Sequence, residues 1–188
     1  MYKIVLTCVL CIFSCYCGAQ SDKGGGLDLP NGFRVGYQRS DMVNNSKTSS
    51  GMLDRGYIGY VRKIGRAPIV HLETGLEFMI AGAEQTDTSK LDLYYFSAPL
   101  QGVLKIGPIV AVAGVNANFR IAEKFTESGK SITRDKEEKS AIFDVAADAG
   151  IGFNILMITL EARYYWGLLE VDNGWNNRYL QLGLKFHF

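Results

Sequence analysis

The sequence holds two histidines, the residues best suited to acid–base or metal chemistry near neutral pH. His71, Glu73 and Glu77 stand at alternating positions, so an extended chain would place one imidazole and two carboxylates on the same face. Such a set could bind a metal ion, or the histidine could act as a general base supported by a carboxylate. His187 lies next to the C-terminus. Whether either histidine can act in catalysis or metal binding depends on where the strands that contain them place it.

Charged residues follow the same alternation elsewhere in the chain. An extended strand directs successive side chains to opposite faces, and in seven segments the charges lie opposite an aliphatic face, whereas the phase of 52–63 is the least clear. The set contains five cations and five acids, namely Arg34, Glu73, Glu77, Lys105, Arg120, Asp144, Asp148, Glu161, Arg163 and Lys185. Unpaired charges in an interior would be very costly, so we expect these residues to form a charge-balanced polar network.

The sequence contains eight segments with this period, and seven of them carry the ten charges. The eight segments span residues 32–39, 52–63, 69–81, 93–106, 109–121, 141–153, 157–168 and 178–188. Strands of about 9 to 11 tilted residues are enough to cross a bilayer. The connections alternate between tight turns at 64–68, 107–108 and 154–156 and long polar loops at 40–51, 82–92, 122–140 and 169–177. Short turns at one end and long loops at the other are typical of outer-membrane barrels.

These segments predict an all-β fold, an eight-stranded antiparallel transmembrane up-and-down β-barrel over residues 32–188. Inside a bilayer every backbone N–H and C=O must be paired, and a sheet achieves this only by closing. A soluble barrel would carry its apolar face inside and its charges outside, the reverse of the pattern here. Eight strands enclose a space that side chains can just fill, so we expect a packed polar lumen rather than an open pore.

The predicted barrel indicates whether the two histidines could be catalytic, because it predicts where they lie. His71 and His187 would both lie at the short-turn end, away from the opposite rim where outer-membrane enzymes hold their catalytic groups. We therefore predict no catalytic residue, no bound metal and no cofactor. The mature chain would be neutral, with 19 cations (20 less Lys3) against 19 acids, and a nucleic-acid partner normally requires a basic excess.

Residues 1–19 have the features of a secretory signal peptide. Lys3 precedes an apolar stretch at 4–17, and small residues follow up to Ala19, after which cleavage is expected. The stretch is short of the roughly 20 residues that a membrane-spanning helix needs, so an anchor helix is the weaker interpretation. All four cysteines lie in this segment, which leaves the mature chain without a disulfide framework. Residues 20–31 would form a short lead, and an even strand count would place both termini on the periplasmic side.

Aromatic residues cluster near the predicted strand ends. Tyr and Trp suit a membrane–water interface because one end of the side chain is apolar and the other can stay hydrated. We expect interfacial rings built from Tyr94, Tyr95, Tyr164, Tyr165, Trp166, Trp175, Phe186 and Phe188. A β-sandwich that uses these side chains as its core is the alternative interpretation.

Several stretches resemble a known family over nearly the whole mature chain. They are DLYYFSAPL at 92–100, GIGF at 150–153, LEARYYWGL at 160–168, and the closing segment 178–188. They are similar to the outer-membrane β-barrel domain proteins of Bacteroidota, often called PorT-like or porin-family proteins. The chain departs from that family at Ser97 and Ala98, where relatives tend to carry an acid and an aliphatic residue. The resemblance also implies that Leu184, Phe186 and Phe188 form the C-terminal signal read by the outer-membrane assembly machinery.

The expected function is that of a non-enzymatic bacterial outer-membrane protein with a structural, adhesive or assembly role. Its partners would be outer-membrane lipid and the assembly machinery. The long loops 40–51, 82–92, 122–140 and 169–177 offer sites for an extracellular or secretion-system partner, and the charge run within 122–140 is either such a site or a solvated surface. Porin-like passage of small solutes and, from the PorT resemblance, an accessory role in protein secretion are alternatives. An outer-membrane enzyme is the least favoured.

Overall fold

The structure is a computed structural model of the whole chain. It describes residues 31–44, 47–48, 51–65, 67, 69–86, 89–128, 130–132, 140–172 and 174–188. The predicted signal peptide and the lead before residue 31 lie outside the described residues. Within the described residues, no helix is long and apolar enough to cross a bilayer.

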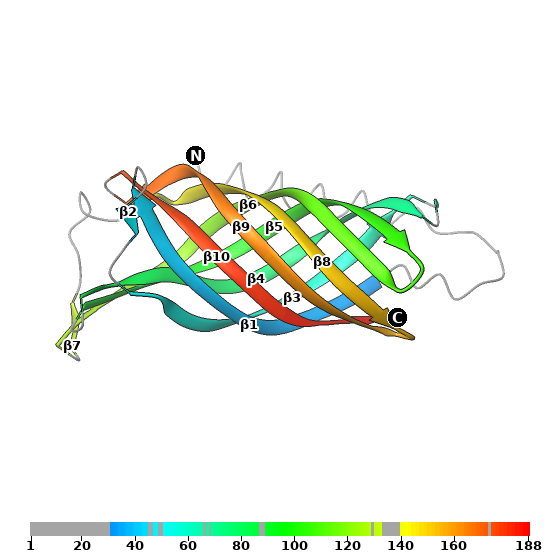
Figure 1. Cartoon of the computed structure of the whole chain (residues 1–188). Coiled ribbons are helices and arrows are strands. Elements are labelled where there is room, and N and C mark those ends of the chain that lie inside the picture. The colour runs from blue at the N-terminus through cyan, green and yellow to red at the C-terminus, as the bar shows by residue number, and fades with distance from the viewer. Residues whose placement is uncertain are drawn as a thin grey trace.

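Among the described residues, ten strands form one antiparallel sheet, and eight of them close into a barrel (Figure 1). The strands are β1 Asn31–Asn44, β2 Lys47–Thr48, β3 Leu53–Ile64, β4 Val70–Thr86, β5 Ser89–Ile106, β6 Ile109–Glu127, β7 Lys130–Ile132, β8 Phe143–Ile155, β9 Ile158–Asp172 and β10 Trp175–His187. The short strands β2 and β7 pair only with β1 and β6, beyond the barrel wall. Every other strand pairs with the long strands before and after it, which is the up-and-down arrangement.

The barrel closes through the pairing of β1 with β10. Their register runs from Gly32 opposite His187 to Val43 opposite Asn176. At the end of this ladder, the backbone N–H of Asn31 donates to the Phe188 carbonyl at 3.2 Å, and the Phe188 N–H donates to the Asn31 carbonyl at 3.0 Å. The predicted fold class, an all-β eight-stranded antiparallel barrel, is confirmed.

The two ends of the barrel differ. At one end, called here the short-turn end, two-residue turns join β5 to β6 and β8 to β9, and β1 starts beside the end of β10. The other, called the long-loop end, carries β2 and β7 and lies at the left of Figure 1. The strands extend further here than the sequence predicted, because β4 continues to Thr86, β6 to Glu127 and β9 to Asp172. Strands that pair outside the bilayer do not need alternating apolar residues. The polar segments 82–92 and 122–127 therefore lack the alternation from which a strand could be predicted.

Successive side chains alternate between the lumen and the outside, as the period-two pattern requires. On β1, Phe33 and Val35 are exposed on the outer face, whereas Arg34 and Gln38 are fully buried in the lumen. Glycines on the lumen face make room for large side chains on neighbouring strands. A Cβ added to Gly183 would lie 2.3 Å from the Tyr57 hydroxyl oxygen and 2.6 Å from a backbone carbonyl oxygen.

Candidate functional site

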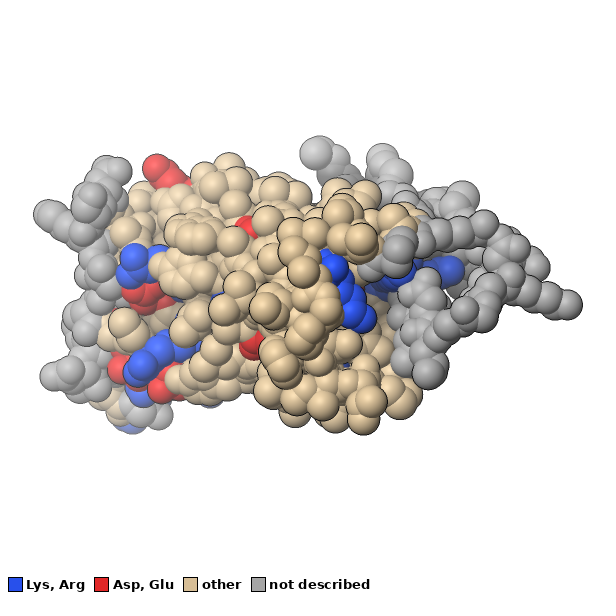
Figure 2. All heavy atoms as spheres, turned by 45° about the vertical axis from the view of Figure 1, so that its right-hand side comes forward, with Lys and Arg blue, Asp and Glu red and all other residues tan. Residues whose placement is uncertain are grey.

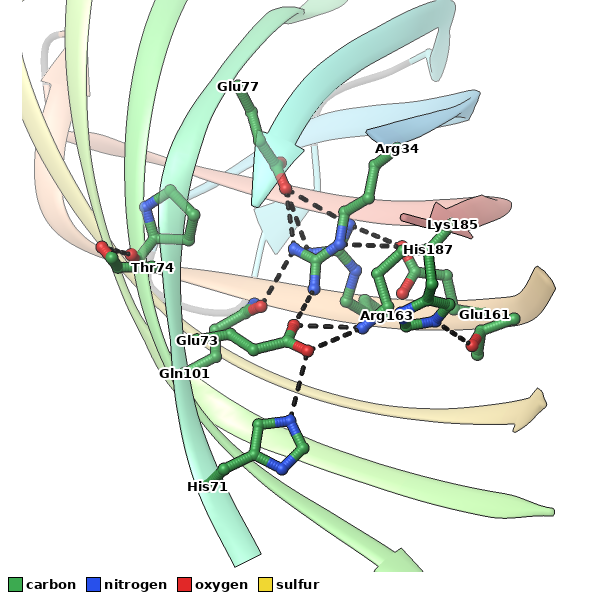
Figure 3. A network of polar contacts seen from close by, with 12 residues as sticks. Arg34, His71, Glu73, Thr74, Glu77, Gln101, Glu161, Arg163, Lys185 and His187 are labelled. Carbon is green, nitrogen blue, oxygen red and sulfur yellow. Dashed lines mark hydrogen bonds and ion pairs between the residues drawn. The ribbon is translucent and has the colours of Figure 1, made fainter. Parts of the chain in front are cut away.

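The short-turn half of the lumen holds a network of buried ion pairs centred on Arg34 (Figure 3). Its guanidinium donates through Nη1 to Glu77 Oε1 at 2.9 Å and to Gln101 Oε1 at 3.0 Å. It donates through Nη2 to Glu73 Oε2 at 3.0 Å. The Glu161 carboxylate lies 3.4 Å from Arg34 Nε. One side chain from β1 therefore reaches acids on β4 and β9, across the width of the barrel.

Two further cations complete the network. Arg163 donates to Glu161 Oε1 at 3.0 Å and lies 3.4 Å from Glu77 Oε1. Lys185 Nζ donates to both oxygens of Glu73, at 2.9 and 3.1 Å. Three cations thus face the three glutamates, and each glutamate contacts two cations. Breaking a buried ion pair is strongly destabilising because it leaves a charge without compensation, so the balance explains how the barrel tolerates these groups.

Amide side chains extend the network to a fourth acid. Gln101 accepts from Arg34 and donates through Nε2 to Asp148 Oδ2 at 2.7 Å. Asn116 Nδ2 donates to the other oxygen of Asp148 at 2.8 Å. Gln181 donates to Gln38 at 2.8 Å. Polar side chains from seven barrel strands, all except β3, consequently meet across the lumen in this half.

The long-loop half of the lumen holds a large cluster of apolar and aromatic side chains beside buried polar groups such as Asp144 and Asn177. The sequence predicted a polar lumen and not this cluster. The buried cluster consists of Met42, Tyr57, Met79, Ala81, Ala83, Leu91, Leu93, Tyr95, Ala146, Tyr165, Val171 and Tyr179, with Phe125 and Trp175 packed against it. Tyr165 and Tyr179 stack with their ring centroids 4.3 Å apart. The guanidinium carbon of Arg163 lies 5.7 Å from the ring centroids of Tyr57 and Tyr165, which joins this layer to the ion pairs.

Three of the ten residues predicted for the polar network lie outside it. Lys105 is exposed, because it is next to the β5–β6 turn and its side chain reaches the rim. Arg120 lies beyond the pairing of β6 with β8, and its guanidinium donates to the carbonyl oxygens of Ala141 and Ser140 and to Glu123. Asp144 is buried, but the donors on its carboxylate are Asn118 and Asn177, each at 3.3 Å.

The histidines occupy the short-turn end of the lumen and contact neighbours there. His71 Nε2 lies 3.4 Å from Glu73 Oε1, and His187 Nε2 lies 2.8 Å from the Thr159 hydroxyl. Glu73 is already bound by Arg34 and Lys185. Among the described residues, no group of three or more histidine, cysteine or acidic side chains is arranged to hold a metal ion.

The barrel wall continues past its rim at the long-loop end as an extension built from β4, β5, β6 and β7 (Figure 1). The last pair between β6 and β8 is Phe119 with Phe143, yet β6 continues to Glu127, opposite Ser89 of β5. These eight further residues of β6 reach roughly 26 Å along the strand, at about 3.3 Å per residue. Phe125 packs against the lumen cluster, whereas Ile121 and Ile132 are exposed on the extension.

The family-level comparison agrees with this architecture. The model of the outer membrane protein beta-barrel domain matches residues 19–173. The chain belongs to this family. Comparison of the sequence with curated proteins gives no match.

Solved outer-membrane barrels share the fold of this family member. The attachment invasion locus protein Ail of Yersinia pestis superposes with a TM-score of 0.51 at 17% identity, covering 85% of this chain and 99% of Ail. Neisserial surface protein A, NspA, superposes with a TM-score of 0.60 at 12% identity, covering 84% of this chain and 97% of NspA. Ail has also been solved with the heparin analogue sucrose octasulfate, and that structure gives a TM-score of 0.53 at 18% identity, covering 84% of this chain and 97% of Ail. At these identities the likeness shows the fold.

The outer face of this outer-membrane barrel is apolar, as contact with lipid requires. Exposed apolar side chains cover it on every barrel strand, including Phe33, Val35, Ile58, Leu76, Phe96, Leu100, Val115, Ile151, Leu160, Trp166 and Leu182. The predicted interfacial aromatic rings need correction. Tyr95 and Tyr165 lie inside the lumen with 0% and 1% exposure, because they share the inward phase of Gln101 and Arg163. Trp175 packs against the lumen cluster.

Proposed function

We propose that this outer-membrane protein is a non-conducting barrel that presents its β4–β7 extension at the cell surface as an adhesive or recognition element. The observation that carries the proposal is the occupied lumen beneath a projecting sheet. Ion pairs around Arg34 span one half of the lumen, and the cluster around Tyr95 and Tyr165 fills the other. Because side chains of the described residues occupy both halves of the lumen, we take the extension to be the functional surface of the molecule.

The orientation belongs to the same proposal. The long-loop end faces the exterior, and the short-turn end, where β1 begins and β10 ends, faces the periplasm. Short periplasmic turns and longer extracellular loops are the general pattern of bacterial outer-membrane barrels. The loops around 40–51, 82–92, 122–140 and 169–177 would then be available to an extracellular partner.

Ail has been solved with a heparin analogue, which makes sulfated polysaccharide a natural first probe. The described part of the extension does not show a strong basic excess, since Lys90 pairs with Glu84 at its edge and Arg120 contacts Glu123 at its base. A mixed surface with exposed Ile121 and Ile132 favours a protein partner over a polyanion.

The alternative drawn from the PorT-like resemblance is an accessory role in protein secretion in a member of the Bacteroidota. Part of the resembling stretch has a structural explanation, since Glu161 and Arg163 form a 3.0 Å ion pair inside the lumen. An activity as a porin or as an enzyme would need a water path or a free catalytic group. We propose neither, because the lumen is packed and both histidines are engaged at the short-turn end.

Adhesion by whole cells tests the proposal. A non-adherent host bacterium displaying the protein is applied to immobilised sulfated polysaccharide, extracellular-matrix proteins and cultured epithelial cells. We expect adherence to at least one surface, and its loss in the double variant Ile121→Ser with Ile132→Ser. The Leu156→Gly variant at the opposite end is the matched control and keeps adherence. Cells displaying the wild-type protein that bind no better than the empty host would contradict the proposal.

A further inference from the structure

The rim of the short-turn end is apolar up to the tips of its turns. Ile106 and Ile109 flank the β5–β6 turn, Ile155 is the last residue of β8, and Leu156 and Met157 form the β8–β9 turn; all five residues are at least half exposed. The two turns are neighbours, because the N–H of Asn154 donates to the Pro108 carbonyl at 2.7 Å. Turns that faced only water would carry polar residues.

Leu156 is the most unusual residue of this rim. Its side chain is 92% exposed, and its backbone φ is 55°. The β5–β6 turn has a φ of 60° at the corresponding first position and fills it with Gly107, the residue that accepts positive φ without a steric penalty. A bulky residue at positive φ is an outlier that points to a role for its side chain. A leucine that costs backbone free energy and is left almost fully exposed by the described residues points to a partner for its side chain outside the barrel.

Charge is distributed unevenly between the two ends. Among the described residues, the acids that are not buried all lie at the long-loop end, for example Asp54, Glu84 and Glu127. At the short-turn end, Lys105 is exposed and Arg62 is half-buried on the outer face. Figure 2 shows the same pattern on one side of the molecule: red and blue are mixed at its left end, and only blue appears toward the right. The short-turn rim therefore combines exposed apolar tips with cations.

The apolar rim is continuous with the lipid-facing wall of the barrel. On β8, Ile151, Phe153 and Ile155 follow one another on the outer face down to the turn, and Ile109 lies at the same rim on β6. A surface that continues the lipid belt and ends in cations matches the boundary between acyl chains and phosphate headgroups.

We propose that the short-turn rim is a lipid-binding anchor. Leu156 and Met157 insert among the acyl chains of the adjoining leaflet, and Lys105 binds the phosphates of anionic phospholipids. This site is separate from the surface extension and rests on the barrel's membership of the outer-membrane family rather than on adhesion. It fixes the depth at which the barrel sits in the bilayer.

A tryptophan reporter tests the insertion. The Met157→Trp variant is reconstituted in vesicles containing phosphatidylcholine brominated in its acyl chains, and the signal of the wild-type protein is subtracted. We expect the added fluorescence to be blue-shifted and strongly quenched. Ile132→Trp, at the projecting end, is the matched control and stays unquenched. Added fluorescence from residue 157 with the emission of a hydrated tryptophan would overturn the proposal. Boiling-dependent gel mobility verifies folding of each variant, and Ile109→Trp replaces Met157→Trp if that variant fails to fold.

The headgroup preference is measured with the same reporter. Quenching by brominated phosphatidylglycerol is compared with quenching by brominated phosphatidylcholine, which gives their relative affinity at the rim. We expect a preference for the anionic lipid, and about a fivefold reduction of that preference in Lys105→Gln, since one cation near an anionic surface contributes about that factor. Lys130→Gln, on β7, leaves the preference unchanged. Equal quenching by the two lipids, or a preference unaffected by Lys105→Gln, would overturn the assignment of phosphate binding to this rim.

Discussion

Removal of the Arg34 guanidinium is the perturbation with the best-defined structural consequence. Arg34 is fully buried and contacts Glu73, Glu77 and Glu161 together with Gln101. The Arg34→Met variant keeps an unbranched side chain of similar length but leaves three buried carboxylates facing two cations. We expect it to lower the free energy of unfolding substantially.

The expected loss of unfolding free energy depends on which cations remain beside each glutamate in the variant. Breaking a buried ion pair by removing one partner costs about 3–5 kcal/mol. Here Glu73 keeps Lys185, and both Glu77 and Glu161 keep Arg163. Because no carboxylate is left without a cation, we expect the low end of that range, about 3 kcal/mol. Adding Glu77→Gln to Arg34→Met restores the balance of charge and should recover part of the loss.

The matched control is an arginine on the same strand that faces outward. Arg39 lies 3.1 Å from Asp54, and both side chains are about half exposed. Exposed ion pairs contribute roughly 0–1 kcal/mol, so Arg39→Met should change stability little. Unfolding in guanidinium chloride is followed for vesicle-reconstituted protein by tryptophan fluorescence and by boiling-dependent gel mobility. If Arg34→Met were no more destabilising than Arg39→Met, the account of the lumen as a balanced ion-pair network would be wrong.

Three further outcomes follow from the structure. Gly183→Ala should destabilise the barrel by about 1–3 kcal/mol in the same unfolding assay, because the new methyl meets the Tyr57 hydroxyl and a backbone oxygen; Gly102→Ala, whose Cβ would meet only an oxygen at 3.6 Å, should be tolerated. Tyr165→Ala should cost about 3–5 kcal/mol through the cavity it leaves beside Tyr179, whereas a loss below 1 kcal/mol would show that the aromatic layer is not packed. If Leu184, Phe186 and Phe188 form an assembly signal, Phe188→Ser should reduce folded protein in the outer membrane of cells while leaving refolding in vitro nearly unchanged; equal losses in both assays would indicate a purely structural role.

Period-two alternation predicted the barrel well, because a membrane barrel needs it on every strand. The wall must be apolar outside, so Phe33 and Val35 alternate with Arg34 and Gly36 whatever fills the lumen. The same constraint places both ends of the barrel-forming chain at one rim, since the strand number is even. Strands that pair outside the bilayer at the long-loop end do not need an apolar outer face. For this reason the sequence predicted the extension as loop.

The contents of the lumen were only partly predictable. Alternation assigns a residue to a face but gives no depth along the barrel, so Arg120 and Lys105 could not be separated from Arg34 and Arg163. It places Tyr165 on the inward face of β9 with Arg163, but it does not distinguish a ring inside the lumen from a ring at the membrane interface. The contacts within the network link strands far apart in sequence, for example Arg34 with Glu161, and depend on barrel closure.

Electrical conductance across a planar bilayer distinguishes an occupied lumen from an open one. The purified barrel is inserted at low density and recorded under applied voltage in concentrated salt, with a variant carrying Tyr95→Ala, Tyr165→Ala and Tyr179→Ala measured alongside. We expect no steady conductance from the wild-type protein, because the ion pairs and the aromatic layer close the lumen in series. Stable, stepwise conductance from the folded wild-type barrel would contradict it.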